Sequence, residues 1–546
     1  MAILTALQGL PISNEAVTGA LVVLVTAYIV YSLRIRFRLS HIPGPWHAGF
    51  TRLGFAWDAF KSRQPQAAKE YHDKYGRLVR IAPNLVLTDD PDATRQIMGA
   101  RSKYTRSAVW YSVARFDPDR DTLFNLADDD FHTLMRKKMA PGYFGKENDS
   151  IEAGVDDRVV AFIKLIEDKY LSTAAEFRPM DLASRAQYFT VDVISALAFG
   201  KTFGCLEKDA DLKLYVESIE GSIPRAPFFS MFPEVTKWLY RRPLRWVFFP
   251  EDKPVGLGPI IGVAKRIIEE RFTPDGHDKD PKRDMLASFM RHGISPNQAV
   301  GEAVLQMVAG SDTSATLIRT AILHLLSNHV AYRRLQAEID RCLADGTISN
   351  MNPSNDSTST IIVKDSEGRR MPYLQAVIKE SLRMAPPAAQ YFPRVVPPEG
   401  DTISGFFVPG GTEVGYTILS MCKRNDIFGE DAHVWRPERW LECGAQNLAR
   451  MNGTVDLVFN HGKWQCLGKH IALMEFNKIF IELFKRFDMS IVDAYKPAAV
   501  ACQPGLYLME DFWIRITRRE SDDPAQFASN GVDLGLGEPL ETAVAE

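Results

Sequence analysis

One short loop near the C-terminal end of the chain has the residue types needed to present a reactive sulfur. It runs from Phe459 to Gly468 as FNHGKWQCLG and follows the pattern F-x-x-G-x-x-x-C-x-G. Gly462 and Gly468 allow backbone amides to approach the sulfur of Cys466, and a helix predicted from Lys469 onward adds the positive end of its dipole. These surroundings predict a lowered thiol pKa. A thiolate held in this way is a suitable axial ligand for haem iron.

The wider cysteine pattern supports this interpretation of Cys466. An isolated cysteine at the start of a helix is more often structural, but the two glycines and the leading aromatic residue favour a ligand. The chain has 6 cysteines, scattered without a C-x-x-C or Cys/His finger spacing. This pattern excludes a disulfide scaffold and argues against a structural zinc site.

A second group of chemically active residues lies within a long helix, which is predicted to begin at Ser295-Pro296 and to end near Asn328. Glycine in a helix interior costs about 1 kcal/mol relative to alanine, so Gly310 indicates that another element approaches the backbone closely. Asp312 and Thr313 follow it. An acid beside a hydroxyl group can hold water and deliver protons.

A third group is ionic. Glu380 and Arg383 form an E-x-x-R pair on one face of a predicted helix, and Arg439 follows in the sequence PERW. Alone, such a pair is common on protein surfaces. A buried network of the acid and both arginines could instead lock the cysteine loop in place.

In this order and at these separations, the motifs resemble the cytochrome P-450 family of haem-thiolate monooxygenases, over about residues 40–515. The resemblance implies a mainly α fold with small β-sheets, in which one large haem domain binds haem b. It also implies that Cys466 is the proximal iron ligand and that Asp312 and Thr313 activate oxygen. The structural triad that it implies consists of Glu380, Arg383 and Arg439.

The resemblance further implies residues that bind the anionic haem propionates. His132 and Arg136 occupy the W/H-x-x-x-R positions of a helix predicted after Asp128-Asp129-Asp130, and Arg394 matches another contact. Trp464 departs from the family pattern, which has a basic residue there, because an indole N–H donates one hydrogen bond and has no charge. Charge neutralisation is then left to Arg136, Arg394 and His132. An ordinary capped or core histidine is the alternative for His132. The loop residues expected to surround the cofactor are Phe459, Gly462, Trp464 and Gly468.

The N-terminal segment predicts a membrane anchor. Residues 16–33 are apolar and uncharged, which is about the minimum length for spanning a bilayer, and Arg34, Arg36 and Arg38 follow. The positive-inside rule places residues 1–15 in the lumen of the endoplasmic reticulum and the catalytic domain in the cytosol, behind a single-pass helix. A cleaved signal peptide would have its charges before the apolar run.

The remaining organisation follows from composition. A basic, proline-rich hinge is predicted at 34–53, a haem domain at 54–518 and an acidic disordered tail at 519–546. Two runs at 78–82 and 85–88 predict a hairpin, and the polar stretch 345–370 predicts a surface insertion. Hydrophobic residues make up 46% of the chain and charged residues 24%, which excludes wholesale disorder. A net charge of −3 gives no reason to expect nucleic-acid binding.

The implied activity is oxygenation of a lipophilic small molecule with O₂ and with NADPH electrons from NADPH–cytochrome P-450 reductase; cytochrome b5 is a further donor. Basic residues on the thiolate side of the haem are predicted to bind the acidic electron donor; a solvated helix face is the alternative. These residues are Arg136, Lys137, Lys138, Lys463 and Lys469. Distal segments near 104–125, 220–250, 386–393 and 503–509 are apolar and aromatic, as a lipophilic substrate requires. Their candidate lining residues include Trp110, Tyr111, Tyr391, Leu506 and Leu508.

The loop string GKWQCLGK is similar to that of fungal enzymes of the pisatin-demethylase type, which indicates secondary-metabolite biosynthesis of terpenoids or polyketides. Two alternatives remain open. One is an isomerase, dehydratase or peroxide-using enzyme of the same fold, against which the intact pair Asp312 and Thr313 argues. The other is a non-catalytic haem-binding protein.

Overall fold

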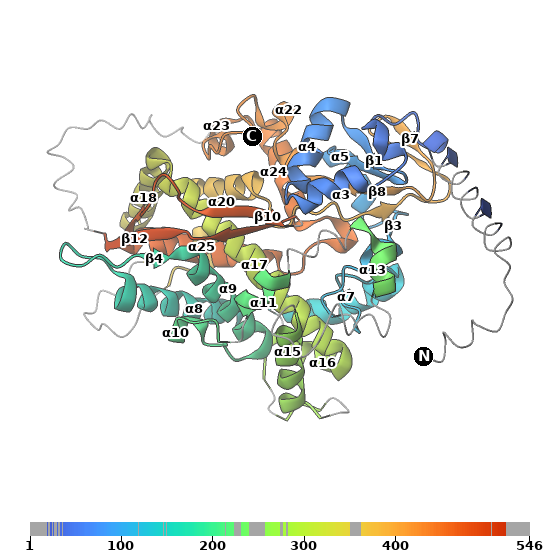
Figure 1. The fold of residues 1–546 in the computed structure, drawn as a ribbon. Helices are drawn as coiled ribbons and strands as arrows, with labels where there is room; N and C mark the ends of the chain where they lie inside the picture. Colours follow the sequence, from blue (N-terminus) through green and yellow to red (C-terminus); the bar gives the residue numbers. More distant parts are fainter. Residues whose placement is uncertain are drawn as a thin grey trace, which may run out of the picture.

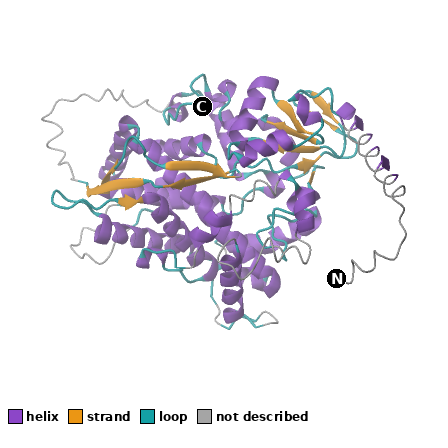
Figure 2. Ribbon diagram, in the orientation of Figure 1, coloured by secondary structure: helices purple, strands orange, loops and turns teal. Residues whose placement is uncertain are grey.

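The structure is a computed structural model and describes residues 36–519, apart from 118, 146, 149, 213–214, 223–230, 240–256, 274–276, 280–281, 350–361 and 504, together with a few positions between 19 and 34. Helices form most of this part of the chain, and the strands gather into small sheets (Figure 2). The fold is therefore mainly α with small β-sheets, as the sequence predicts. Much of the predicted polar insertion and nearly all of the predicted tail lie outside the described residues.

The longest helix, α17 (Pro296–Leu326), passes through the middle of the molecule (Figure 1). It begins where the sequence predicts, with a reciprocal capping box between Ser295 and Gln298. Helix α9 (Leu182–Phe199) packs along it. A Cβ atom added to Gly310 would lie 2.8 Å from the side chain of Ile194 on α9. The close approach expected at Gly310 is thus the packing of α9.

Shorter helices surround this pair. Before α9 the chain forms α3 (Leu53–Phe60), α4 (Gln64–Tyr75), α5 (Pro91–Met98), α6 (Ala108–Tyr111), α7 (Asp129–Tyr143) and α8 (Ile151–Leu165). Between α9 and α17 it forms α10 (Cys205–Lys208), α11 (Tyr215–Ser222), α13 (Pro233–Leu239), α15 (Gly258–Arg271) and α16 (Met285–Arg291). After α17 it forms α18 (His329–Ala344), α19 (Asp365–Gly368), α20 (Pro372–Met384), α21 (Ile418–Cys422), α22 (Asn425–Phe428), α23 (Arg439–Glu442), α24 (Ala445–Asp456) and α25 (Lys469–Arg486).

The predicted hairpin forms two strands of a five-stranded sheet with the order β1-β2-β8-β5-β3. Its members are β1 (Leu78–Ala82), β2 (Leu85–Thr88), β3 (Thr105–Arg106), β5 (Arg394–Val395) and β8 (Glu413–Tyr416). The other sheets pair β6 (Asp401–Ile403) with β7 (Phe406–Val408), β10 (Ala499–Gln503) with β11 (Leu506–Glu510), and β12 (Trp513–Arg518) with β4 (Met180–Asp181) and β9 (Phe487–Ile491). Strand β11 contacts α17, because the Thr316 hydroxyl donates to the Tyr507 carbonyl at 2.7 Å.

Most of the predicted anchor, 16–33, lies outside the described residues. No helix within the described part of the chain is both long enough and apolar enough to cross a bilayer. The predicted hinge is packed on the domain: Leu39 and Ile42 are buried in its core, and Arg38 donates to the Gly410 carbonyl.

The E-x-x-R pair lies on α20 and is fully buried. Glu380 accepts hydrogen bonds from Arg383 at 2.7 and 2.8 Å, and Arg439, at the start of α23, donates to it at 3.0 Å. Trp440 Nε1 and the Arg436 backbone amide also donate to this carboxylate. Burial alone would raise the Glu380 pKa, but the two arginines hold it below the usual carboxyl value. The network ties α20 to the segment that leads to the cysteine loop.

We expect Glu380→Ala to lower the free energy of unfolding by roughly 3–5 kcal/mol, because it leaves the buried Arg383 guanidinium without a carboxylate and Arg439 with Asp431 alone. The measurement is urea unfolding at neutral pH, where a carboxyl with a lowered pKa is ionised and its contribution is fully present. Asp92→Ala is the matched control: Asp92 also pairs with an arginine three residues on, Arg95, but its side chain is exposed. Equal losses of unfolding free energy in the two variants would contradict a structural role for the triad.

Candidate active site

The cysteine loop is shaped by backbone contacts that the glycines permit. Gly462 has a φ of 60°, and a Cβ atom there would lie 2.2 Å from the Met98 carbonyl oxygen. The amide of Cys466 donates to the Phe459 carbonyl at 2.8 Å, which closes the loop just before α25 begins at Lys469. The Lys469 ammonium lies 5.5 Å from the centre of the Phe459 ring. The loop therefore holds Cys466 in one defined position.

Cys466 is exposed to solvent, although many protein atoms surround it. Burial raises its pKa, while the Gly468 amide, the Arg136 charge and the Lys469 amide and charge act in the opposite direction. The prediction of a lowered thiol pKa was wrong for the protein alone, because burial outweighs the amides and cations. The amide donors that we predicted are present, and the sulfur is accessible to a ligand.

An accessible stripe lies on the otherwise buried centre of α17. Leu305, Ala309 and Thr313 recur every four residues and are at least partly exposed, whereas most of the neighbouring positions are buried. The Thr313 hydroxyl donates to the Ala309 carbonyl at 2.9 Å. Asp312 is buried on a different face, and burial raises its pKa to about 6. The two residues of the predicted oxygen-activating pair thus face different surroundings.

Two buried arginines are direct partners across neighbouring strands. Arg106 on β3 pairs with Arg394 on β5, and both side chains are inaccessible to solvent. Like charges in such opposed positions are destabilising. The Arg394 guanidinium lies 4.1 Å from the centre of the Trp464 ring, and the Lys463 ammonium lies 4.4 Å from it. With Arg136, these side chains form a cationic cluster (Arg106, Arg136, Arg394 and Lys463) beside the cysteine loop.

His132 on α7 lies against this cluster and is uncharged. Burial lowers its pKa to about 3, and the charges of all four cluster members act in the same direction. It can therefore donate a hydrogen bond but adds no positive charge at neutral pH. Arg136, one turn further on, donates to the Gln465 carbonyl at 2.6 Å and faces the cysteine loop. Lys463 forms an ion pair with Asp129 at 2.7 Å.

The cluster has the donors that an anionic cofactor requires. Four buried nitrogen atoms in and beside the cluster have no hydrogen-bond partner among the residues that the structure describes: Nε of Arg106, Nε of Arg394, Nδ1 of His132 and Nε1 of Trp464. Buried polar atoms in proteins are nearly always hydrogen-bonded. Carboxylates of haem propionates would satisfy these donors and offset the buried positive charge. These donors, together with the accessible sulfur on the neighbouring loop, match the groups that bind haem.

The predicted substrate-facing residues divide into two groups. Trp110, Tyr111 and Tyr391 are buried in the core, and the Tyr111 hydroxyl accepts a hydrogen bond from Arg394 at 2.6 Å. Tyr111 thus orients an arginine of the cationic cluster. Leu506 and Leu508 on β11 are partly exposed beside α17, where a substrate could contact them.

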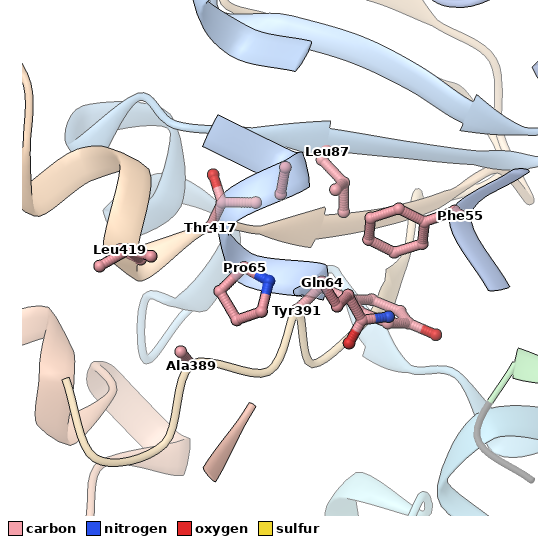
Figure 3. Close-up of a pocket in the computed structure, with 9 residues that line it drawn as sticks. Phe55, Gln64, Pro65, Leu87, Ala389, Tyr391, Thr417 and Leu419 are labelled. Atoms are coloured by element: carbon pink, nitrogen blue, oxygen red, sulfur yellow. The ribbon is translucent and has the colours of Figure 1, made fainter. Parts of the chain in front are cut away.

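Figure 3 shows a small cavity of about 10 Å³ between α3, α4 and the loop that contains Tyr391. Phe55, Gln64 and Thr417 are among its lining residues. This volume is about that of one water molecule. The cavity borders neither α17 nor the cysteine loop, so it is not the substrate site.

An accessible cysteine on a closed loop, a long helix with an accessible stripe and a partly buried cationic cluster define a haem-thiolate enzyme. The profile of the cytochrome P450 family matches residues 45–511. Cytochrome P450 monooxygenase ABA1 of Pyricularia oryzae is 37% identical over 508 residues, which cover 92% of this chain and 96% of that protein. Cytochrome P450 monooxygenase aba1 of Botryotinia fuckeliana is 33% identical over 490 residues, covering 89% and 93%. The chain belongs to the cytochrome P450 family, whose members bind haem iron through a cysteine thiolate.

Arg106 is the main site residue that the sequence analysis missed. Its strand has only two residues, too few for a recognisable pattern, and it pairs with a strand almost 300 positions later. The sequence Tyr-Thr-Arg-Ser offers one signal, an arginine among residues that favour strands. That signal is too common to identify a cofactor contact.

We expect Arg106→Gln to speed the transfer of haem from the protein to apomyoglobin by about 10-fold or more, because a hydrogen bond to a charged group contributes about 1.5–3 kcal/mol. The matched control is Arg101→Gln, which removes an exposed arginine five residues earlier. If the two variants lose haem at the same rate, Arg106 does not bind the cofactor.

Proposed function

We propose that this protein is a membrane-anchored monooxygenase of the endoplasmic reticulum that oxygenates a lipophilic small molecule. The electrons come from NADPH through NADPH–cytochrome P-450 reductase, with cytochrome b5 as a further donor. The observation that supports this most directly is the accessible Cys466 on a loop beside the partly buried cationic cluster, combined with the accessible stripe on α17. Cys466 would hold the iron of such a cofactor, and Thr313 would contribute its hydroxyl to the site.

In this site the haem supplies reductive activation of O₂ and insertion of one oxygen atom into the substrate. Cys466 provides the thiolate, and Arg106, Arg394, His132 and Trp464 hold the propionates. Thr313 presents its hydroxyl to the substrate side of the site. Asp312, with a pKa of about 6, can hold a proton or release it near neutral pH, as a proton-delivering group must. The presence of this acid and this hydroxyl favours an oxygen-activating enzyme over an isomerase, which would need no protons from the protein.

We expect Cys466→Ala to remove the red-shifted Soret band that reduced thiolate-ligated haem gives with carbon monoxide, and to abolish product formation with reductase and NADPH. The matched control is Cys443→Ala, which removes a half-buried cysteine and should change neither readout. A Cys466→Ala protein that retained the band would show that another residue binds the iron.

Exposed apolar side chains support contact with a membrane beside the predicted anchor. Trp46 is 80% exposed, and Leu53, Trp57 and Phe60 share the outer face of α3. Trp238 of α13 is also exposed. Arg52, just before α3, and Pro233, the first residue of α13, line one small cavity, so the two helices begin near each other. We name Trp46, Leu53, Trp57, Phe60 and Trp238 the aromatic face. Exposed tryptophans of this kind are typical of side chains that insert at a bilayer interface.

We expect a protein that lacks residues 1–33 to keep its haem and to bind vesicles of phosphatidylcholine and phosphatidylserine through the aromatic face. Adding Leu53→Ser and Trp57→Ser should weaken that binding by about 10-fold or more, because each buried apolar side chain contributes about 1.5–3 kcal/mol. The measurement is vesicle co-sedimentation. Leu441→Ser removes an exposed leucine on α23 and is the control. Unchanged binding in the double variant would contradict a membrane role for this face.

Electron donors would bind on the outer side of α7 and the cysteine loop. Lys137 is exposed there beside the apolar side chains of Phe131 and Leu134. Lys469 pairs with Asp456, and Lys138 donates to the Gly293 carbonyl, so these two lysines are partly engaged within the protein. An acidic partner would therefore contact Lys137 first, with the apolar pair adding buried area.

The substrate class rests on two observations. Leu506 and Leu508 present apolar surface beside α17, which suits a lipophilic molecule. The relatives are fungal monooxygenases, and the loop string has the fungal character described above. Both support a role in fungal secondary metabolism with a terpenoid or polyketide substrate.

A further inference from the structure

A chain of buried polar side chains links Asp312 to two other helices. Gln187 on α9 donates from Nε2 to Asp312 Oδ1 at 2.9 Å. The hydroxyl of Tyr215, the first residue of α11, donates to Asp312 Oδ2 at 2.9 Å. Arg319, two turns further along α17, donates to Gln187 Oε1 at 2.9 Å. All four side chains are buried.

The Gln187 amide has one consistent orientation, and the Tyr215 hydroxyl also contacts the Ser311 hydroxyl and, at 3.1 Å, the Met307 carbonyl. Arg319 can only donate, so the oxygen of the Gln187 amide must face it and the NH₂ group must face Asp312. The Tyr215 phenol is neutral, because burial and the Asp312 charge raise its pKa well above the usual value. Both carboxyl oxygens of Asp312 therefore accept hydrogen bonds, an arrangement that stabilises the ionised form and fixes its orientation.

This orientation directs the acid away from the accessible stripe. Successive helical residues point about 100° apart, so Thr313 lies on the stripe while Asp312 faces α9 and α11. The Thr313 hydroxyl donates to Ala309, and the residues that the structure describes include no hydrogen bond between Thr313 and Asp312. The groups that hold the carboxyl thus determine both its direction and the pH at which it exchanges a proton.

We propose that Tyr215 and Gln187 are positioning residues for proton delivery, which hold the Asp312 carboxyl and set its affinity for a proton. The inference rests on the proposed role of Asp312 and names residues for which neither the family motifs nor the relatives assign a function. Without the Tyr215 hydroxyl, the ionised carboxyl would lose one of its two side-chain donors on neighbouring helices.

The charges around Asp312 give the sign of the effect. Burial raises its pKa, whereas the Tyr215 hydrogen bond, the Arg319 charge and the Gln187 hydrogen bond lower it. Among the described groups, Asp211 acts on Tyr215, and Glu475 of α25 faces Ser314 on another side of α17. Removing either donor therefore favours the protonated acid and shifts its titration to higher pH.

The test uses haem-loaded protein and two readouts. The first is the pH midpoint of the Asp312 carboxyl stretch in infrared difference spectra, assigned with Asp312→Asn. The second is the pH dependence of product formed per NADPH consumed. We expect Tyr215→Phe to raise the infrared midpoint by about one pH unit, as loss of a hydrogen bond to a charged group implies. The pH profile should move by the same amount, with KM unchanged.

Two further variants keep the test decisive. Gln187→Met has a similar volume and should shift both readouts in the same direction, which covers the case that Tyr215→Phe folds poorly. Tyr332→Phe is the matched control, because Tyr332 is also a buried phenol that donates to a carboxylate, Asp488, at 3.3 Å. It should shift neither readout.

The outcomes separate the inference from the function on which it rests. An infrared midpoint that stays at the wild-type value in both variants overturns the inference, whatever the activity. A midpoint that moves while product per NADPH keeps its wild-type pH profile overturns the link to proton delivery and, with it, the proposed role of Asp312. Parallel shifts in both readouts support the inference.

Discussion

The site depends on two guanidinium groups that lie side by side in a dry interior. Arg106 and Arg394 are cross-strand partners, and their Nε atoms have no protein acceptor among the described residues. Two uncompensated buried cations are costly, so this part of the fold is complementary to an anion. Burial, together with the same positive charge, lowers the pKa of His132 and keeps it neutral. Cofactor binding and stability of the sheet edge are therefore expected to be coupled.

The rest of the fold positions three elements around this charge. The buried network of Glu380, Arg383 and Arg439 fixes the segment before the cysteine loop, and Gly462 brings that loop against the backbone after α5. On the substrate side, the packing of α9 against Gly310 fixes α17. Helix α9 also supplies Gln187, so the element that packs on the helix orients its acid as well.

Local patterns in the sequence predicted the parts of the site that are local in structure. The cysteine loop, the capped start of α17 and the i,i+3 pair on α20 each depend on residues close together in the chain. The missed features depend on distant partners: Gln187 and Tyr215 are 125 and 97 positions from Asp312, and β3 has only two residues. The charge states of Cys466 and His132 could not be predicted from the sequence either, because burial controls their pKa values.

The cationic cluster is tested most directly by an experimental structure of the haem-loaded protein at a resolution that places the propionates. We expect Cys466 Sγ to bind the iron and the propionate oxygens to accept hydrogen bonds from Arg106 Nε, Arg394 Nε and Trp464 Nε1. Propionates directed elsewhere, with these three nitrogen atoms still lacking partners, would contradict the claim that the buried cations exist to hold the cofactor.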